Sequence, residues 1–199
     1  MPHIHTKPDQ HDMTASAYIL RQENGVWKCL VHFHKKVEKL MQVGGHIELN
    51  ETPWQTIAHE LSEESGYSLA ELQVLQHTAD RLPESRNITH PVPVLMNTHN
   101  VGDDHFHSDL CFGFVALTYP RSAVKEGESA DLRWLTIDEL ESCAKEGAAL
   151  EDVAHMYRFI LDHLDTYARV SAESFSLDKP VDAGLVYLRG SAAEARSVT

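Results

Sequence analysis

Residues 45–67, GHIELNETPWQTIAHELSEESGY, decide the fold because they hold the signals that begin and end a helix. Thr52 is a preferred N-cap, Pro53 suits the first helical position, and Gln55 completes a capping box. Gly66 supplies the left-handed residue with which many helices end. These signals predict a helix of about thirteen residues between Thr52 and Gly66.

The predicted helix has two faces. An apolar stripe can pack on a core, and its members are Trp54, Ile57, Ala58 and Leu61. Glu60, Glu63 and Glu64 form a second stripe at i, i+3, i+4 spacing, and no lysine or arginine of the helix balances their charge. A solvated acidic face is one interpretation. The other is a divalent cation, because oxygen ligands favour a hard ion such as Mg²⁺ or Mn²⁺.

The same residues resemble the Nudix box, G-x5-E-x7-R-E-U-x-E-E-x-G-U, in which U is a bulky apolar residue. The matching positions are Gly45, Glu51, Glu60, Leu61, Glu63, Glu64 and Gly66. His59 stands where the family has arginine, and Tyr67 is a loose match to an aliphatic position. A pattern with this many fixed positions is highly specific.

The resemblance implies a role for each matched residue. Glu60 and Glu64 correspond to the principal metal ligands, and Glu63 to a further ligand that binds directly or through water. The carbonyl of Gly45, or of its neighbour, is expected to face the metal. Glu51 corresponds to the family's supporting carboxylate.

His59 is the departure that bears on catalysis. The family arginine holds the catalytic glutamate, whereas an imidazole is shorter, lacks the guanidinium fork and titrates near neutrality. The general base is expected to be Glu60 or a carboxylate outside the box. Glu126 and Glu128, in a polar loop over residues 120–130, are candidates.

The expected reaction is hydrolysis of a phosphoanhydride in a nucleoside diphosphate linked to another group X. ADP-ribose-like and nucleoside triphosphate substrates are favoured, and Pro83, after the box, moves this expectation slightly toward ADP-ribose. Arg81 and Arg86 are candidate phosphate contacts. Two alternatives stay open: a Nudix-type isomerase, and a Nudix-fold binding or regulatory domain with weak or no turnover, which only His59 favours.

Histidines gather in a second region, between strands predicted over residues 92–101 and 109–119. If the second strand begins at His105, then His105, His107 and Asp109 share a face, with His99 alongside in a hairpin. Three interpretations stay open: a pocket lining that meets phosphate or ribose, hydrated imidazoles at the mouth of the strands, and a transition-metal site.

The order of elements predicts one α/β domain. Further strands are expected near residues 16–21, 26–33, 37–43, 71–78 and 131–135, with a helix from residue 137 and a long amphipathic helix over 148–169. The resemblance refines this to a Nudix-like α/β/α sandwich with a mixed β-sheet, the box helix on one side and the long helix on the other. We expect a flexible N-terminal arm over 1–14, the hydrolase domain over 15–170, and a C-terminal extension over 171–199 with a strand or tail at 184–188.

Composition bounds the partners. The net charge of −13 argues against binding a nucleic acid polymer or an anionic membrane, but allows a small anionic phosphoanhydride at a metal site. Cys29, Cys111 and Cys143 are far apart and predict reduced thiols in a cytoplasmic protein. The start of the chain lacks the apolar region of a signal peptide. A homodimer contact through the predicted helix at 148–169 stays open.

Overall fold

The computed structural model describes residues 10–79, 89–102 and 105–175. The helices are α1 (Pro53–Glu60), α2 (Ile137–Lys145) and α3 (Glu151–Asp162). A π-helical turn, Leu61–Ser65, continues α1, and short 3-10 turns cover Leu69–Glu71, Leu164–Thr166 and Ala172–Phe175. The strands are β1 (His11–Glu23), β2 (Val26–His34), β3 (Lys39–Met41), β4 (Val43–His46), β5 (Leu72–Gln76), β6 (Leu95–Gly102), β7 (His105–Ala116), β8 (Leu132–Leu135) and β9 (Ala168–Ser171).

The long strand β1 organises the sheet. It runs parallel to β7 from His11 to Leu20, and the other pairings between named strands of the described residues are antiparallel. Its other edge changes partner: residues 14–17 pair with β4, and residues 20–23 pair with β2. The predicted mixed sheet is therefore confirmed, with strand order β3-β2-β1-β7-β5-β9 and with β4, β6 and β8 on β1, β7 and β2.

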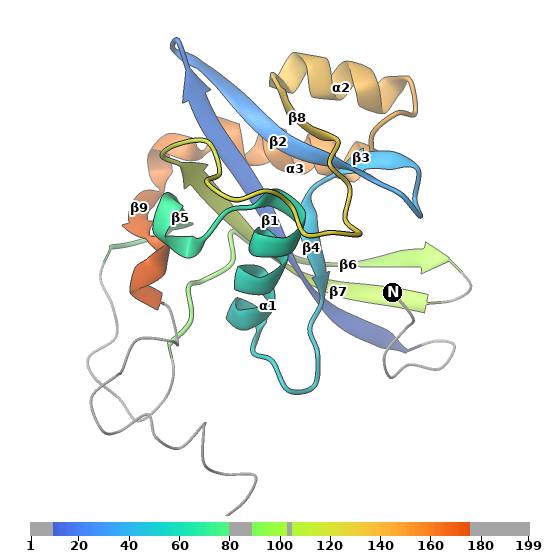
Figure 1. Cartoon of the computed structure of the whole chain (residues 1–199), viewed down its shortest axis with the longest axis horizontal. Helices are drawn as coiled ribbons and strands as arrows, with labels where there is room; N and C mark the ends of the chain where they lie inside the picture. The colour runs from blue at the N-terminus through green and yellow to red at the C-terminus, as the bar shows by residue number, and fades with distance from the viewer. Residues whose placement is uncertain (1–9, 80–88, 103–104, 176–199) are drawn as a thin grey trace, which may run out of the picture.

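Two apolar cores lie on opposite faces of this sheet, as the side-chain alternation of β1 requires. Ile19 is fully buried in the core that contains Trp54 of α1. Leu20 is fully buried in the core that contains Tyr157 of α3 and Leu140 of α2. Figure 1 shows α1 on one side of β1 and α3 on the other. The α/β/α arrangement expected from the sequence is confirmed.

Three element boundaries differ from the predictions. The helix predicted over residues 148–169 ends at Asp162, and the chain then forms β9, which supplies the edge of β5 with hydrogen-bonding partners. The strand predicted over 37–43 is divided into β3 and β4, after a turn in which Glu38 has a φ of 56°. β1 begins at His11, so residues 11–14, predicted to lie in the N-terminal arm, belong to the sheet.

The cysteines and the two ends of the chain were also the subject of predictions. Cys29 and Cys111 are buried free thiols, and Cys143 is a partly buried one. The strand-like run at 184–188 and residues 1–9 of the predicted arm lie outside the described residues. Within the described ranges, none of the helices has the length and apolar character needed to cross a bilayer.

Candidate active site

The box helix begins as the sequence predicts and ends differently. Thr52 is the N-cap: its hydroxyl accepts from the Gln55 amide at 3.3 Å, and the Gln55 side chain accepts from the Thr52 amide at 2.9 Å. After Glu60 the helix widens into the π-helical turn, and the Gly66 amide, at a φ of 73°, donates to the Leu61 carbonyl. The helical stretch has the predicted length, but its last turn is π-helical and not α-helical. Glu60, Glu63 and Glu64 nevertheless line the same cleft.

Glu64 points into the fold. Its Oε2 accepts a hydrogen bond from the Gly44 amide at 3.0 Å and lies 3.6 Å from Nε2 of His32. Burial raises the pKa of Glu64 to about 8, and it lowers the pKa of His32 to about 4, so this imidazole is neutral at pH 7. Gly44 is required here, because a Cβ at its φ of 154° would lie 2.5 Å from the Ala15 carbonyl oxygen.

Glu60 is the second buried carboxylate, with 9% of its surface exposed. Burial raises its pKa to about 7, against the opposing influence of His59. Among the described residues, neither Glu60 nor Glu64 forms an ion pair with lysine or arginine. Two buried carboxylates that no lysine or arginine of the described residues neutralises are a donor set that fits a divalent cation.

Glu63, in contrast, takes part in an ion-pair network. Its Oε1 lies 2.7 Å from Nε2 of His59 and also contacts the Lys125 ammonium. Partial burial acts to raise the pKa of Glu63, but the hydrogen bonds from Lys125 and His59 lower it. Nδ1 of His59 lies 3.3 Å from Oε1 of Glu51, whose other oxygen accepts from the Thr56 hydroxyl at 3.0 Å. His59 thus bridges Glu51 and Glu63.

The charge of His59 follows from these neighbours. Burial acts to lower its pKa, but the hydrogen bond with Glu63 and the charges of Glu63, Glu51 and Glu60 raise it above its usual value. The acidic neighbours therefore favour the protonated imidazole.

The loop before β8 closes over the end of the box. A Cβ on Gly66 would lie 2.1 Å from the Ser122 carbonyl oxygen, and the Lys125 amide donates to the Glu63 carbonyl at 2.8 Å. Glu128, one of the two predicted bases from this loop, lines the cleft, and its charge acts to raise the pKa of Glu60 and Glu64. Glu126 is not among the cleft-lining residues.

A cleft of about 1310 Å³ lies beside these carboxylates. Several sequence-predicted residues line it: Gly45, Glu51, His59, Glu60, Glu63, Glu64, His99, His107 and Asp109. Asp109 is buried and already hydrogen-bonded, because it accepts from the Thr14 hydroxyl at 2.9 Å and from the Cys111 thiol at 3.2 Å. Arg81 and Arg86 lie outside the described residues.

The predicted histidines meet near the end of the sheet. His99 of β6 is opposite His107 of β7, with ring centroids 5.6 Å apart, and His99 also contacts the Asn97 side chain at 2.8 Å. Burial, together with the neighbouring imidazoles, lowers the pKa of His107 to about 4. His105 is buried beside Asp12, with Nε2 and Oδ2 3.2 Å apart.

Sequence reasoning missed two of the residues that hold the carboxylates. His32 had a signal, since a lone polar residue in the apolar run of β2 is unusual for a buried strand. Lys125 had none, because it lies in a polar loop and meets Glu63 only through the tertiary fold.

Comparisons with known proteins identify the family. The NUDIX domain profile matches residues 10–159. No curated protein sequence matches the chain.

Several solved structures have a similar fold. A NUDIX-family hydrolase from Clostridium perfringens has a TM-score of 0.59 and 24% identity, covering 77% of this chain and 97% of its own. The C. elegans Ap4A hydrolase has a TM-score of 0.55 and 14% identity, covering 78% and 98%. The NUDIX domain of Shewanella oneidensis NrtR, complexed with ADP ribose, has a TM-score of 0.55 and 12% identity, covering 78% and 89%. With a domain match over most of its length and the box residues gathered at one cleft, the chain belongs to the Nudix family.

Proposed function

We propose that this chain hydrolyses a phosphoanhydride bond in a nucleoside diphosphate linked to another group, using Mg²⁺ or Mn²⁺. Its enzyme class, a Nudix pyrophosphohydrolase, follows from the family match. The observation that carries the proposal is the pair of buried carboxylates, Glu60 and Glu64, beside a large cleft.

Glu60 and Glu64 would hold the cation, with Glu63 and the carbonyl of Gly45 nearby. A bound divalent ion supplies charge neutralisation of the diphosphate and acidifies a water molecule. The Gly44 amide fixes the orientation of Glu64, while His59 and Lys125 hold Glu63 on the rim.

The general base would be a cleft carboxylate. Glu60 is one candidate because its carboxylate lies in the cleft beside the proposed cation. Glu128 is the alternative from outside the box, since it lines the same cleft. Either residue would take the proton of the attacking water as the water bonds to phosphorus and the bridging oxygen leaves.

The substrate class is supported by size and charge. A cleft of about 1310 Å³ exceeds the usual range for small-ligand pockets, so it has room for groups on both sides of a diphosphate. Lys35 and Lys36 line it and would attract an anion, and His99 and His107 would contact ribose or phosphate. The similar folds include an Ap4A hydrolase and a domain complexed with ADP ribose, which agrees with a nucleotide substrate.

A product screen with Mg²⁺, and then Mn²⁺, would test this function. The panel contains ADP-ribose, nucleoside triphosphates, dinucleoside polyphosphates and nucleotide sugars, with phosphate measured after phosphatase treatment. We expect turnover of at least one substrate, and loss of that turnover in Glu64→Gln. Glu126→Gln is the matched control, because it removes a carboxylate from the same acidic region outside the cleft.

The outcomes separate the alternatives. Normal turnover by Glu64→Gln would refute the site assignment. Retention of ADP-ribose without hydrolysis would indicate a binding domain. If the wild type shows no turnover and His59→Arg does, the missing activity is caused by the histidine at the family's arginine position.

A further inference from the structure

We propose that His46, His105 and His107, together with Asp12, form a binding site for a divalent transition-metal ion, separate from the Glu60 and Glu64 site. Zn²⁺ is the ion whose ligand preference these residues fit best. The inference does not depend on the proposed hydrolysis.

The topology places these four residues on one face of the sheet. Asp12 is aligned with His107 in the parallel β1–β7 pair, and His105 lies two residues before His107, on the same face of β7. His46 is opposite Thr14 of β1, which is two residues from Asp12. Three strands that are distant in sequence therefore meet at one point. β1 contributes a carboxylate, β4 contributes one imidazole, and β7 contributes two imidazoles.

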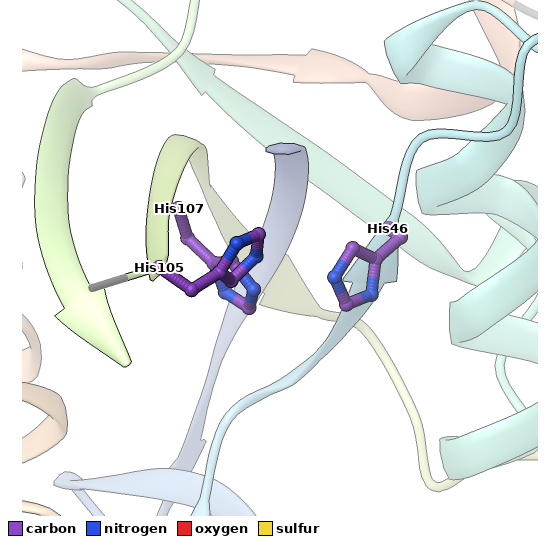
Figure 2. Close-up of side chains that lie close together, drawn as sticks. All are labelled: His46, His105 and His107. Atoms are coloured by element: carbon purple, nitrogen blue, oxygen red, sulfur yellow. The ribbon is translucent and has the colours of Figure 1, made fainter. Parts of the chain in front are cut away.

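The imidazoles face one another at that point. Figure 2 shows the His46 ring, from β4, turned toward the His105 and His107 rings from β7. One nitrogen from each of the three lies within 4.8 Å of the other two. The ring centroids of His46 and His107 are 4.7 Å apart, and those of His105 and His107 are 5.4 Å apart.

Asp12 lies close to two of the three imidazoles. Its Oδ2 lies 3.2 Å from Nε2 of His105 and 3.7 Å from Nε2 of His46. Zn²⁺ binds imidazole and carboxylate at about 2.0–2.1 Å in a tetrahedron, which separates neighbouring donor atoms by about 3.3 Å. The three imidazole nitrogens lie within 4.8 Å of one another, so the widest pair would close by up to about 1.5 Å to reach this spacing.

The donor atoms of this cluster favour a different ion from the one that the box carboxylates favour. Three imidazoles and one carboxylate suit zinc and its neighbours, whereas the oxygen ligands of Glu60 and Glu64 suit Mg²⁺ or Mn²⁺. Asp12 and His105 are 7% exposed, and side chains are rarely this polar and this buried without a structural or ligand-binding reason.

A metal here would join the sheet to the box. His46 lies two residues after Gly44, whose backbone amide donates a hydrogen bond to Glu64. An ion held by His46, His105 and His107 would fix β4 against β7 and limit the movement of that amide. His46 and His107 also line the cleft, so the ion would lie at its edge.

Zinc stoichiometry tests the proposal. The full chain is loaded with Zn²⁺, dialysed and measured by elemental analysis. We expect one equivalent in the wild type and in Glu64→Gln, and a more than tenfold weaker Zn²⁺ affinity in His105→Gln and His107→Gln. Asp12→Asn should weaken binding about 10- to 100-fold. An unchanged stoichiometry and affinity in both histidine variants would overturn the site.

Two controls exclude other histidines. His77→Gln removes a surface histidine that packs on Tyr167, far in sequence from the cluster, and should retain the equivalent. His3→Gln/His5→Gln removes two histidines from the N-terminal residues and should also retain it. Loss in the double variant at His3 and His5, with retention in His107→Gln, would place the zinc in that segment and refute the proposal.

Co²⁺ provides a readout that needs no variant. The wild-type protein with one equivalent of Co²⁺ should show the intense visible absorption of a tetrahedral ion, and Zn²⁺ should abolish it while Mg²⁺ does not. A weak octahedral spectrum that Mg²⁺ abolishes would assign the ion to the carboxylates instead and would overturn the proposal.

Discussion

Replacing Glu64 with glutamine should stabilise the metal-free protein at alkaline pH. The folded pKa of Glu64 is about 8, against 4.5 for an ordinary glutamate. A carboxyl whose pKa is raised by folding contributes stability that is complete below pH 4.5 and is lost as the pH rises through about 8. At pH 8 the lost contribution is about 4 kcal/mol, since each pKa unit corresponds to about 1.36 kcal/mol and the folded group is half ionised.

Thermal unfolding in EDTA between pH 5 and pH 8.5 measures this effect. Wild-type protein should lose melting temperature as the pH rises, and Glu64→Gln should lose about 10 °C less, because 1 kcal/mol shifts a domain of this size by about 2–4 °C. Glutamine keeps an oxygen that can accept the Gly44 amide, so the variant removes the charge rather than the hydrogen bond. Adding Mg²⁺ at pH 8 should then raise the melting temperature of the wild type only.

Glu63→Gln is the matched control. Its folded pKa is lowered, so its stabilising contribution is present at neutral pH and is lost on acidification. The variant should therefore melt below the wild type at pH 8. Parallel pH curves for wild type and Glu64→Gln would refute the reasoning, because they would mean that burial of this carboxyl has no energetic consequence.

Three further changes test the fold and the loop. Gly66→Ala should lower the free energy of unfolding by about 2 kcal/mol in urea, because of its left-handed φ and the collision with the Ser122 carbonyl; no loss would show that the loop can move away. Tyr157→Phe should cost about 1–3 kcal/mol in the same assay, because the hydroxyl serves two buried backbone groups; a neutral result would show that water replaces it. Lys125→Met should raise the Glu63 carboxyl titration midpoint measured by NMR, and an unchanged midpoint would mean that the ion pair does not form in solution.

The sequence was sufficient for the parts of the fold that depend on local chemistry. Thr52 and Gln55 were predicted to start the box helix, and they form the capping box. The order of the predicted strands and helices indicates an α/β sheet, and the resemblance to the Nudix family places the box helix on one side and the long helix on the other, as the two cores show. The capping signals need only residues that lie within one element, whereas the order of the layers rests on the resemblance.

The features that were mispredicted or missed depend on tertiary partners. The π-helical turn at Leu61–Ser65 has the composition of an α-helix, and its wider hydrogen bonding coincides with the contact of Gly66 with Ser122. The end of α3 at Asp162 coincides with β9 joining the edge of β5. Asp12 reaches the histidines only through the parallel register of β1 and β7, which no spacing within one segment reveals.

The close approaches of Gly44 and Gly66 to other backbone segments mean that the Nudix box depends on residues outside it. Gly44, just before the box, is crowded by the Ala15 carbonyl, and Gly66, near its end, by the Ser122 carbonyl. Transplanting residues 45–67 into another scaffold would carry the glutamates without the Gly44 amide that binds Glu64 and without the backbone that packs against the two glycines. A designer who wishes to move this chemistry has to move the long first strand and the late loop with it.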